Sequence, residues 1–122
     1  MIDGAPLSAI AIAADVRSGK RSAKDVVAAS LARARAVDEE RKLNVFLARA
    51  DQQATEFAGR IDALDRGRDR PLLGVPFAAK DNLAAAGLQV SCGSRILQGY
   101  VSPYTATVID RLRAAGAVLI GK

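Results

Sequence analysis

Residues 75–82, Val-Pro-Phe-Ala-Ala-Lys-Asp-Asn, pass from an uncharged run into a polar turn, and this change of pattern indicates the fold class. The uncharged run predicts a buried strand, with Pro76 near its start, where a missing backbone donor is tolerated. A second apolar run at residues 117–120 predicts another buried strand, and a helix is expected between them from Ser102 or Pro103 to Gly116. Strand, helix and strand in this order form a βαβ unit, so the two strands should be parallel.

The 70 residues before this unit predict a layer of helices. Residues 1–70 carry 24 charged side chains and residues 71–122 carry only 7, which indicates a solvated helical layer followed by a buried sheet. Helices are predicted over residues 8–18, from the cap residue Ser22 onward, and over residues 51–65, and residues 44–47 predict a strand or an extended connector. The apolar positions of the three helices are Ile10, Ala13, Ala14 and Val16; Val27, Leu31 and Ala34; and Ala54, Phe57, Ala58, Ile61 and Leu64.

The chain ends at Gly121-Lys122, directly after the second predicted strand. A two-stranded parallel sheet with one exposed edge is a poor stand-alone fold, because the unpaired backbone groups of the edge remain open. We therefore expect these 122 residues to be the N-terminal part of a longer α/β protein.

The composition excludes several kinds of active site. The chain has no His, so it cannot carry Ser-His-Asp or Cys-His catalysis, and its single Cys cannot form an internal disulfide or a thiolate-rich metal site. A proton carrier near neutral pH must therefore be Lys, Asp, Glu, Tyr or Cys. The N-terminus lacks the positive charge and long apolar segment of a signal peptide, and no uncharged stretch is long enough for a membrane span, so we expect a cytoplasmic protein.

Lys80 ends the first predicted strand and should lie at the carboxyl edge of the sheet, where ligand sites in parallel sheets gather. It is either an ordinary lysine that turns outward or a general base. A lysine base must be neutral, so its pKa has to fall from about 10.4 towards 7, which corresponds to about 4–5 kcal/mol. Burial and neighbouring dipoles can supply such a shift, and the lysine can then deprotonate a Ser directly or through another hydroxyl.

Two other motifs indicate a function less strongly than Lys80 does. Cys92 could combine with Lys80 and a distant Glu in a nitrilase-type site, but every Glu of the chain lies on a surface-like helix, so we interpret Cys92 as a partly buried structural thiol. Residues 116–122 match the spacing of a phosphate-binding loop as far as Lys122. The intervening residues are strand material and the final Ser or Thr is missing, so nucleotide binding is not expected.

The net charge of +5 does not by itself indicate nucleic-acid binding. Residues 1–70 hold 13 basic and 11 acidic side chains, and residues 71–122 hold 5 and 2, so the excess is spread over both halves. The densest basic stretch, residues 66–70, is interrupted by Asp69 and is typical of a solvated connector. A basic nucleic-acid adaptor is therefore the weakest of the functional hypotheses.

Residues 72–82, Leu-Leu-Gly-Val-Pro-Phe-Ala-Ala-Lys-Asp-Asn, resemble the segment that carries the catalytic lysine of the amidase signature family. The resemblance continues through residues 91–97, 104–108, 112–117 and 120–122, and the N-terminal helices with residues 43–47 resemble the family's opening. It implies an α/β fold in which residues 1–122 are the N-terminal part of a single amidase domain. Residues 1–70 would form the helical layer, and residues 71–122 the start of a mixed, mostly parallel core sheet that carries the lysine.

The resemblance implies Ser-Ser-Lys amide hydrolysis, with Lys80 as the general base. The lysine acts through a bridging Ser in a cis peptide on a nucleophilic Ser, and water resolves the acyl-enzyme; backbone N–H groups of a Gly/Ser-rich segment stabilise the oxyanion. Both serines and that segment lie beyond the family's Gly-Lys, which is Gly121-Lys122 here. Ser91 and Ser94 therefore do not inherit these roles, and the 122 residues alone are expected to have no amidase activity.

Within the family, the stretch around residues 92–97 and 101–104 is most similar to the subfamily of A subunits from tRNA-dependent amidotransferases. This implies glutamine as the amide substrate, ammonia passed to a partner subunit, and subunits B and C and, through them, tRNA as partners. No cofactor or metal is implied for this chain; ATP and magnesium would belong to the partner subunit. Two alternatives remain: an amidase of another small amide, and a non-catalytic module that binds a partner through its helical layer.

Overall fold

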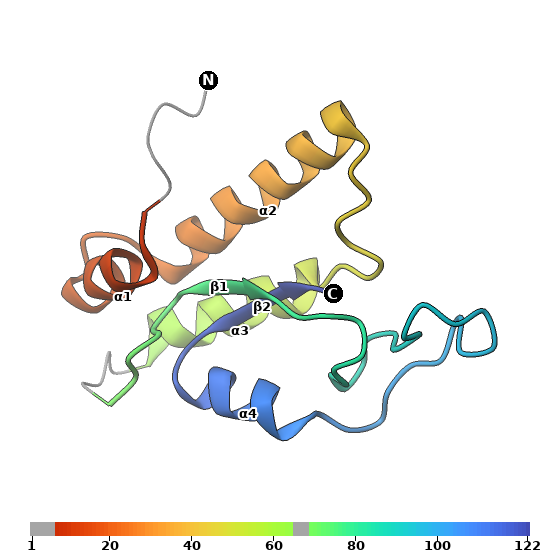
Figure 1. Cartoon of the computed structure of the whole chain (residues 1–122). Helices are drawn as coiled ribbons and strands as arrows, with labels where there is room; N and C mark the ends of the chain where they lie inside the picture. The colour runs from red at the N-terminus through yellow and green to blue at the C-terminus, as the bar shows by residue number, and fades with distance from the viewer. Residues whose placement is uncertain (1–6, 65–68) are drawn as a thin grey trace.

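The structure, a computed structural model, describes residues 7–64 and 69–122, and this part of the chain folds as four helices around a two-stranded sheet. Helices α1 (Ala9–Ser18), α2 (Ala23–Arg41) and α3 (Asp51–Ala63) precede strand β1 (Pro76–Ala78), and α4 (Thr107–Ala114) leads into β2 (Val118–Gly121). The strands are parallel, with Pro76 opposite Val118 and Phe77 opposite Leu119 (Figure 1). The predicted βαβ unit is confirmed.

Side-chain caps fix the starts of the first two helices. The Ser8 hydroxyl accepts a hydrogen bond from the Ala11 N–H at 3.2 Å, and the Ser22 hydroxyl accepts one from the Asp25 N–H at 2.9 Å. Gly19 ends α1 with a φ of 78°, a left-handed conformation that favours glycine. These predictions are confirmed, as is the start of α3; residue 65, where the third helix was predicted to end, lies outside the described residues, as do residues 66–68 of the basic stretch.

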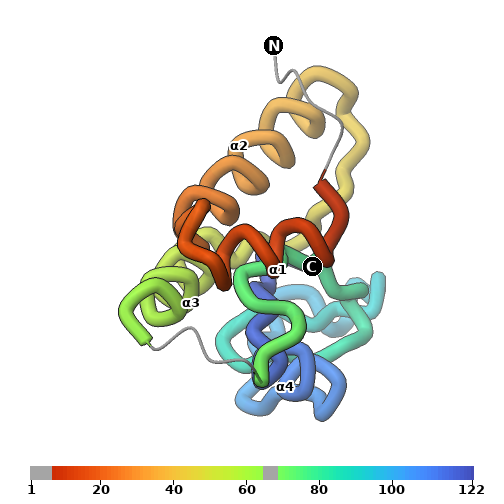
Figure 2. The backbone as a smooth tube through the Cα atoms, turned by 90° about the vertical axis from the view of Figure 1, so that its left-hand side faces the viewer, coloured from red at the N-terminus to blue at the C-terminus, as the bar shows by residue number. Residues whose placement is uncertain are grey.

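Strand β2 is buried on both faces. Val118 and Ile120 belong to a core cluster formed with α1, α2 and α3, whereas Leu119 packs on the other face with Ile109 of α4. Both views show α2 and α4 on opposite sides of the strands (Figures 1 and 2). A strand covered on two faces needs a continuous apolar sequence, which explains why residues 117–120 contain no polar residue.

Three positions of the predicted apolar stripes, Ile10, Ala14 and Leu64, are exposed. Ile10 is 83% exposed, because the buried residues of α1 are Ala13 and Val16 and its first turn lies beyond the core. Leu64 is 54% exposed and follows the last residue of α3. The stripe of α2 is confirmed, with Val27 and Leu31 buried.

The predicted start of the last helix is wrong: α4 begins at Thr107, not at Ser102 or Pro103. The Ser102 N–H donates to the Leu88 carbonyl at 3.0 Å, and the Ala106 N–H donates to the Ala84 carbonyl at 2.9 Å. The Ser102 hydroxyl donates to the Tyr104 carbonyl at 2.7 Å. Residues 102–106 therefore pair with residues 84–88 of the preceding loop, and this pairing delays the helix.

Residues 44–47 form no regular strand, and Asn44 has a φ of 51°. The chain becomes paired a few residues later: the Leu47 N–H donates to the Lys122 carbonyl at 2.7 Å, and the Lys122 N–H donates to the Ala48 carbonyl at 2.7 Å. This connector runs antiparallel to the end of β2. The second edge of β2 is thus covered, and the end of this strand is held on both sides.

Candidate active site at the carboxyl edge of the sheet

Lys80 lies two residues beyond β1, at the carboxyl end of the parallel strands, as the sequence predicts. Its side chain is exposed. Its carbonyl accepts a hydrogen bond from the Leu83 N–H at 3.0 Å, and the preceding Ala79 N–H donates to the Gly121 carbonyl at 3.0 Å. A fixed backbone thus presents an accessible amine at the edge where parallel sheets bind ligands.

The residue after Lys80 belongs to a buried polar network. One oxygen of the Asp81 carboxylate accepts hydrogen bonds from the Ser91 N–H, at 2.9 Å, and from the Ser91 hydroxyl. The other oxygen lies 3.4 Å from the Lys122 Nζ, which also donates to the carbonyls of Asp81 at 3.3 Å and of Gln89 at 2.9 Å. The network joins the end of β1, the loop near residue 90 and the end of β2, and the Lys122 side chain within it is 0% exposed.

The network keeps the Asp81 carboxylate charged. Burial by itself raises the pKa of this carboxyl group, but the two hydrogen bonds from Ser91 and the nearby Lys122 ammonium outweigh that effect. The pKa of Asp81 is therefore lowered from its ordinary value. At neutral pH, Asp81 and Lys122 form a buried ion pair one residue away from Lys80.

Sequence reasoning missed this network. It assigned Ser91 and Lys122 to stretches that resemble the family and gave neither a role beside Lys80, whereas in the structure both hold Asp81. The interpretation of residues 117–120 as a strand is confirmed by the burial of β2. The available signal was the placement of polar residues directly after buried apolar runs, but the contacts span 10 and 41 residues of sequence.

The prediction for Cys92 is wrong, because its side chain is exposed rather than partly buried. Asp81 draws Ser91 inward, and the Ser94 N–H closes a tight turn on the Ser91 carbonyl at 2.8 Å. Cys92 occupies this turn with a φ of 52°. Within the described residues, no group of three or more Cys, Asp or Glu side chains is arranged to hold a metal ion.

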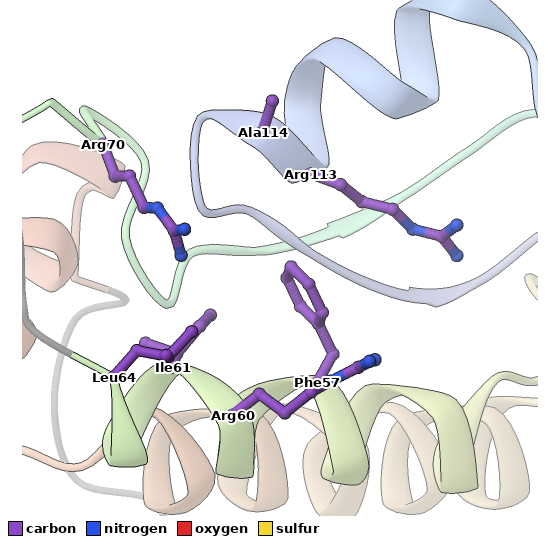
Figure 3. A pocket seen from close by; sticks show the side chains of 7 residues that line it. All are labelled: Phe57, Arg60, Ile61, Leu64, Arg70, Arg113 and Ala114. Atoms are coloured by element: carbon purple, nitrogen blue, oxygen red, sulfur yellow. The ribbon is translucent and has the colours of Figure 1, made fainter.

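A cavity of about 300 Å³ lies between α3 and the end of α4, and Figure 3 shows Phe57 pointing into the space between these helices. Its lining residues are Phe57, Arg60, Ile61, Leu64, Arg70, Arg113 and Ala114. The end of α4 leads into the start of β2, so this cavity adjoins the amino ends of the strands. Lys80 lies at their carboxyl ends, and the cavity is therefore not part of the lysine site.

A second hollow, of about 360 Å³, shares Gln89 and Ser91 with the buried network. Its other lining residues are Leu47, Gly93, Ser94, Arg95 and Gln98. Lys80 is not among the residues that line this hollow, which adjoins the site through Gln89 and Ser91 of the buried network. In the part of the chain that the structure describes, no helix has the length and apolar character needed to cross a membrane.

Comparison with known proteins agrees with this geometry. A curated relative from Deinococcus radiodurans, named as the A subunit of glutamyl-tRNA(Gln) amidotransferase, is 42% identical over 115 residues, which cover 94% of this chain and 23% of the relative. The relative of the same name from Streptomyces coelicolor is also 42% identical and covers 100% of this chain and 24% of its own length. The chain thus spans about a quarter of the length of these relatives.

The crystal structure of the peptide amidase from Stenotrophomonas maltophilia superimposes with a TM-score of 0.87 and 35% identity, over 97% of this chain and 24% of that protein. The sequence profile described as Amidase matches residues 25–122, a range that includes Lys80 and the whole buried network. The structural likeness and the profile match concern the same strands, loop and helices. The chain belongs to the amidase signature family.

Proposed function

We propose that this chain supplies the N-terminal part of a serine amidase, with Lys80 as the general base. The observation that carries the proposal is the place of Lys80: an accessible amine on a fixed backbone, at the carboxyl edge of a parallel sheet, in a stretch that matches the amidase profile. The surrounding residues explain how the amine is presented. The rest of an amidase domain would add the groups that it acts on.

The chemistry needs two hydroxyls from outside this chain. A neutral Lys80 accepts a proton from a bridging Ser, which in turn takes the proton of a nucleophilic Ser as that oxygen attacks the amide carbon. The proton then passes to the leaving nitrogen as the C–N bond breaks, and water hydrolyses the acyl-enzyme. Lys80 is exposed in the 122 residues. In a whole amidase domain, the remaining part of the fold would cover Lys80 and favour its neutral form.

For the substrate we propose glutamine, with ammonia passed to a partner. The support is that relatives 42–51% identical to this chain are named A subunits of the glutamyl-tRNA(Gln) amidotransferase. In that case the partners are subunits B and C and, through them, tRNA, the partner subunit holds ATP and magnesium, and the complex is cytoplasmic. The second candidate is hydrolysis of another amide, which the structural likeness to a peptide amidase supports.

Two matched chimeras test the proposal. In one, residues 1–122 replace the corresponding part of the Deinococcus radiodurans relative; in the other, they replace that of the Stenotrophomonas maltophilia peptide amidase. We expect the first to release ammonia from glutamine at a rate within tenfold of its parent, the second to retain a smaller share of its parent's activity, and the 122 residues alone to release none. Glutamine hydrolysis by the 122 residues alone would contradict the proposal. So would a peptide amidase chimera that keeps a larger share of its parent's activity than the Deinococcus radiodurans chimera keeps.

A further inference from the structure

A buried ion pair lies one residue from the proposed base. The side chains of Lys122 and Asp81 are 0% and 9% exposed, and their charged atoms are 3.4 Å apart. A buried ion pair contributes little stability compared with apolar residues of the same volume, because both charges lose their hydration. Its position beside Lys80 therefore indicates a role in positioning that residue.

The end of β2, at Gly121 and Lys122, holds the backbone on both sides of Lys80. Before it, the Ala79 N–H donates to the Gly121 carbonyl at 3.0 Å; after it, the Asp81 carbonyl accepts a hydrogen bond from the Lys122 Nζ at 3.3 Å. Gly121 and Lys122 are consecutive, and the connector at residues 47–48 holds them from the other edge. The Cα of Lys80 is thus clamped to the end of β2.

The pair also compensates a charge. The Asp81 carboxylate is next to Lys80 in the chain, and the nearest cation to its second oxygen within the described residues is Lys122. Without that partner the carboxylate would remain buried and uncompensated, and the residue after Lys80 would lose the contact that holds it to β2. Lys122 thus holds this residue through its charge as well as through its hydrogen bonds.

We propose that Asp81, Ser91 and Lys122 are positioning residues for Lys80: Lys122 clamps the backbone after the base and neutralises the carboxylate beside it, while Ser91 fixes that carboxylate in place. This inference rests on the proposed role of Lys80. It assigns a function to the Gly-Lys pair that ends β2, separate from the hydroxyl that takes up the acyl group and the hydroxyl that relays its proton.

The first test measures kcat and KM for glutamine, per folded enzyme, in the chimera with the Deinococcus radiodurans relative. We expect Lys122→Met to lower kcat about tenfold and to leave KM within about twofold, because a displaced base slows the proton transfer whereas the substrate still binds. Adding Asp81→Asn removes the uncompensated buried charge but does not restore the clamp, so kcat should stay low. A Lys20→Met control, at a site 72% exposed, should leave both constants unchanged.

A purely structural role would lower the amount of folded enzyme without changing kcat per folded molecule. An unchanged kcat in folded Lys122→Met, or a double variant that restores kcat to that of the parent, would overturn the inference. Lys80→Ala separates this failure from that of the proposed function: if Lys80→Ala abolishes turnover while Lys122→Met leaves kcat unchanged, only the positioning role is wrong.

A second measurement applies to the 122 residues themselves. In amide hydrogen exchange, the double variant Asp81→Asn/Lys122→Met, which lacks the clamp but recovers global stability, should accelerate exchange at Leu83, whose N–H donates to the Lys80 carbonyl, at least tenfold more than at Leu31 in α2. Lys20→Met again serves as the control. Equal acceleration at Leu83 and Leu31, or none at either, would contradict the clamp even if the chimera were inactive.

Discussion

Replacing Lys122 by Met removes one member of the buried ion pair while keeping a side chain of similar length. The Lys122 Nζ lies 3.4 Å from one Asp81 oxygen, and that oxygen has no hydrogen-bond donor within the described residues. At an effective dielectric constant of about 20, two unit charges at this distance attract by about 5 kcal/mol. Removal of one partner from a buried pair costs about 3–5 kcal/mol. We therefore expect Lys122→Met to lower the free energy of unfolding by about 4 kcal/mol, a large share of the total for a small domain.

Urea denaturation of the 122-residue chain, followed by far-ultraviolet circular dichroism, measures this loss. With a denaturant slope of about 2 kcal/mol per molar, the midpoint should fall by about 2 M. The double variant Asp81→Asn/Lys122→Met has no buried charge and should recover at least about 2 kcal/mol, whereas Lys20→Met should stay within about 0.5 kcal/mol of the parent. A loss below about 1 kcal/mol in Lys122→Met, or a double variant no more stable than the single one, would show that the buried pair does not stabilise the fold in this way.

Three further predictions use the same denaturation assay. Gly116→Ala should lower the free energy of unfolding by at least about 2 kcal/mol, because Gly116 has a φ of 92° and a Cβ there would lie 2.8 Å from the Leu73 Cα. Gly93→Ala, at a φ of 71° with open space around the new Cβ, should lower it by about half as much. Equal losses would show that the contact with Leu73 does not matter. Since the folded-state pKa of the Asp81 carboxyl is lowered, the stability that this carboxylate contributes should be complete above about pH 5 and lost as the pH falls below about 4. The double variant, which lacks the ion pair, should lose less stability over this range. Equal losses in parallel acid titrations of the two proteins would contradict this expectation. Ser22→Ala should cost about 1 kcal/mol through loss of the cap of α2, and an unchanged midpoint would show that the cap contributes nothing.

The features predicted from the sequence depend on local chemistry. The starts of α1 and α2 follow from a Ser hydroxyl that reaches an N–H three residues later, and the parallel pairing follows from the order of strand, helix and strand. The place of Lys80 at the carboxyl edge followed in the same way, because it ends an apolar run. Each of these predictions needs only residues that are close together in the chain.

The features that were missed depend on contacts between distant residues. The start of α4 is delayed by pairing of residues 102–106 with residues 84–88, which no local pattern records. Cys92 is exposed because Asp81, 11 residues earlier, holds the neighbouring Ser91. The partnership of Asp81 with Lys122 spans 41 residues and becomes visible only when β1 and β2 lie side by side.

The role of Lys80 as the base is measured by the turnover of glutamine in the Deinococcus radiodurans chimera carrying Lys80→Ala, compared with the same chimera carrying Lys20→Ala. Lys80 and Lys20 are both exposed, so neither substitution should disturb the fold, which circular dichroism can confirm. A lysine that accepts the proton of the nucleophile is required for every turnover, and we expect Lys80→Ala to lower kcat by at least about 10³-fold while Lys20→Ala leaves it within twofold. A folded Lys80→Ala chimera with near-normal kcat would contradict the assignment of Lys80 as the base.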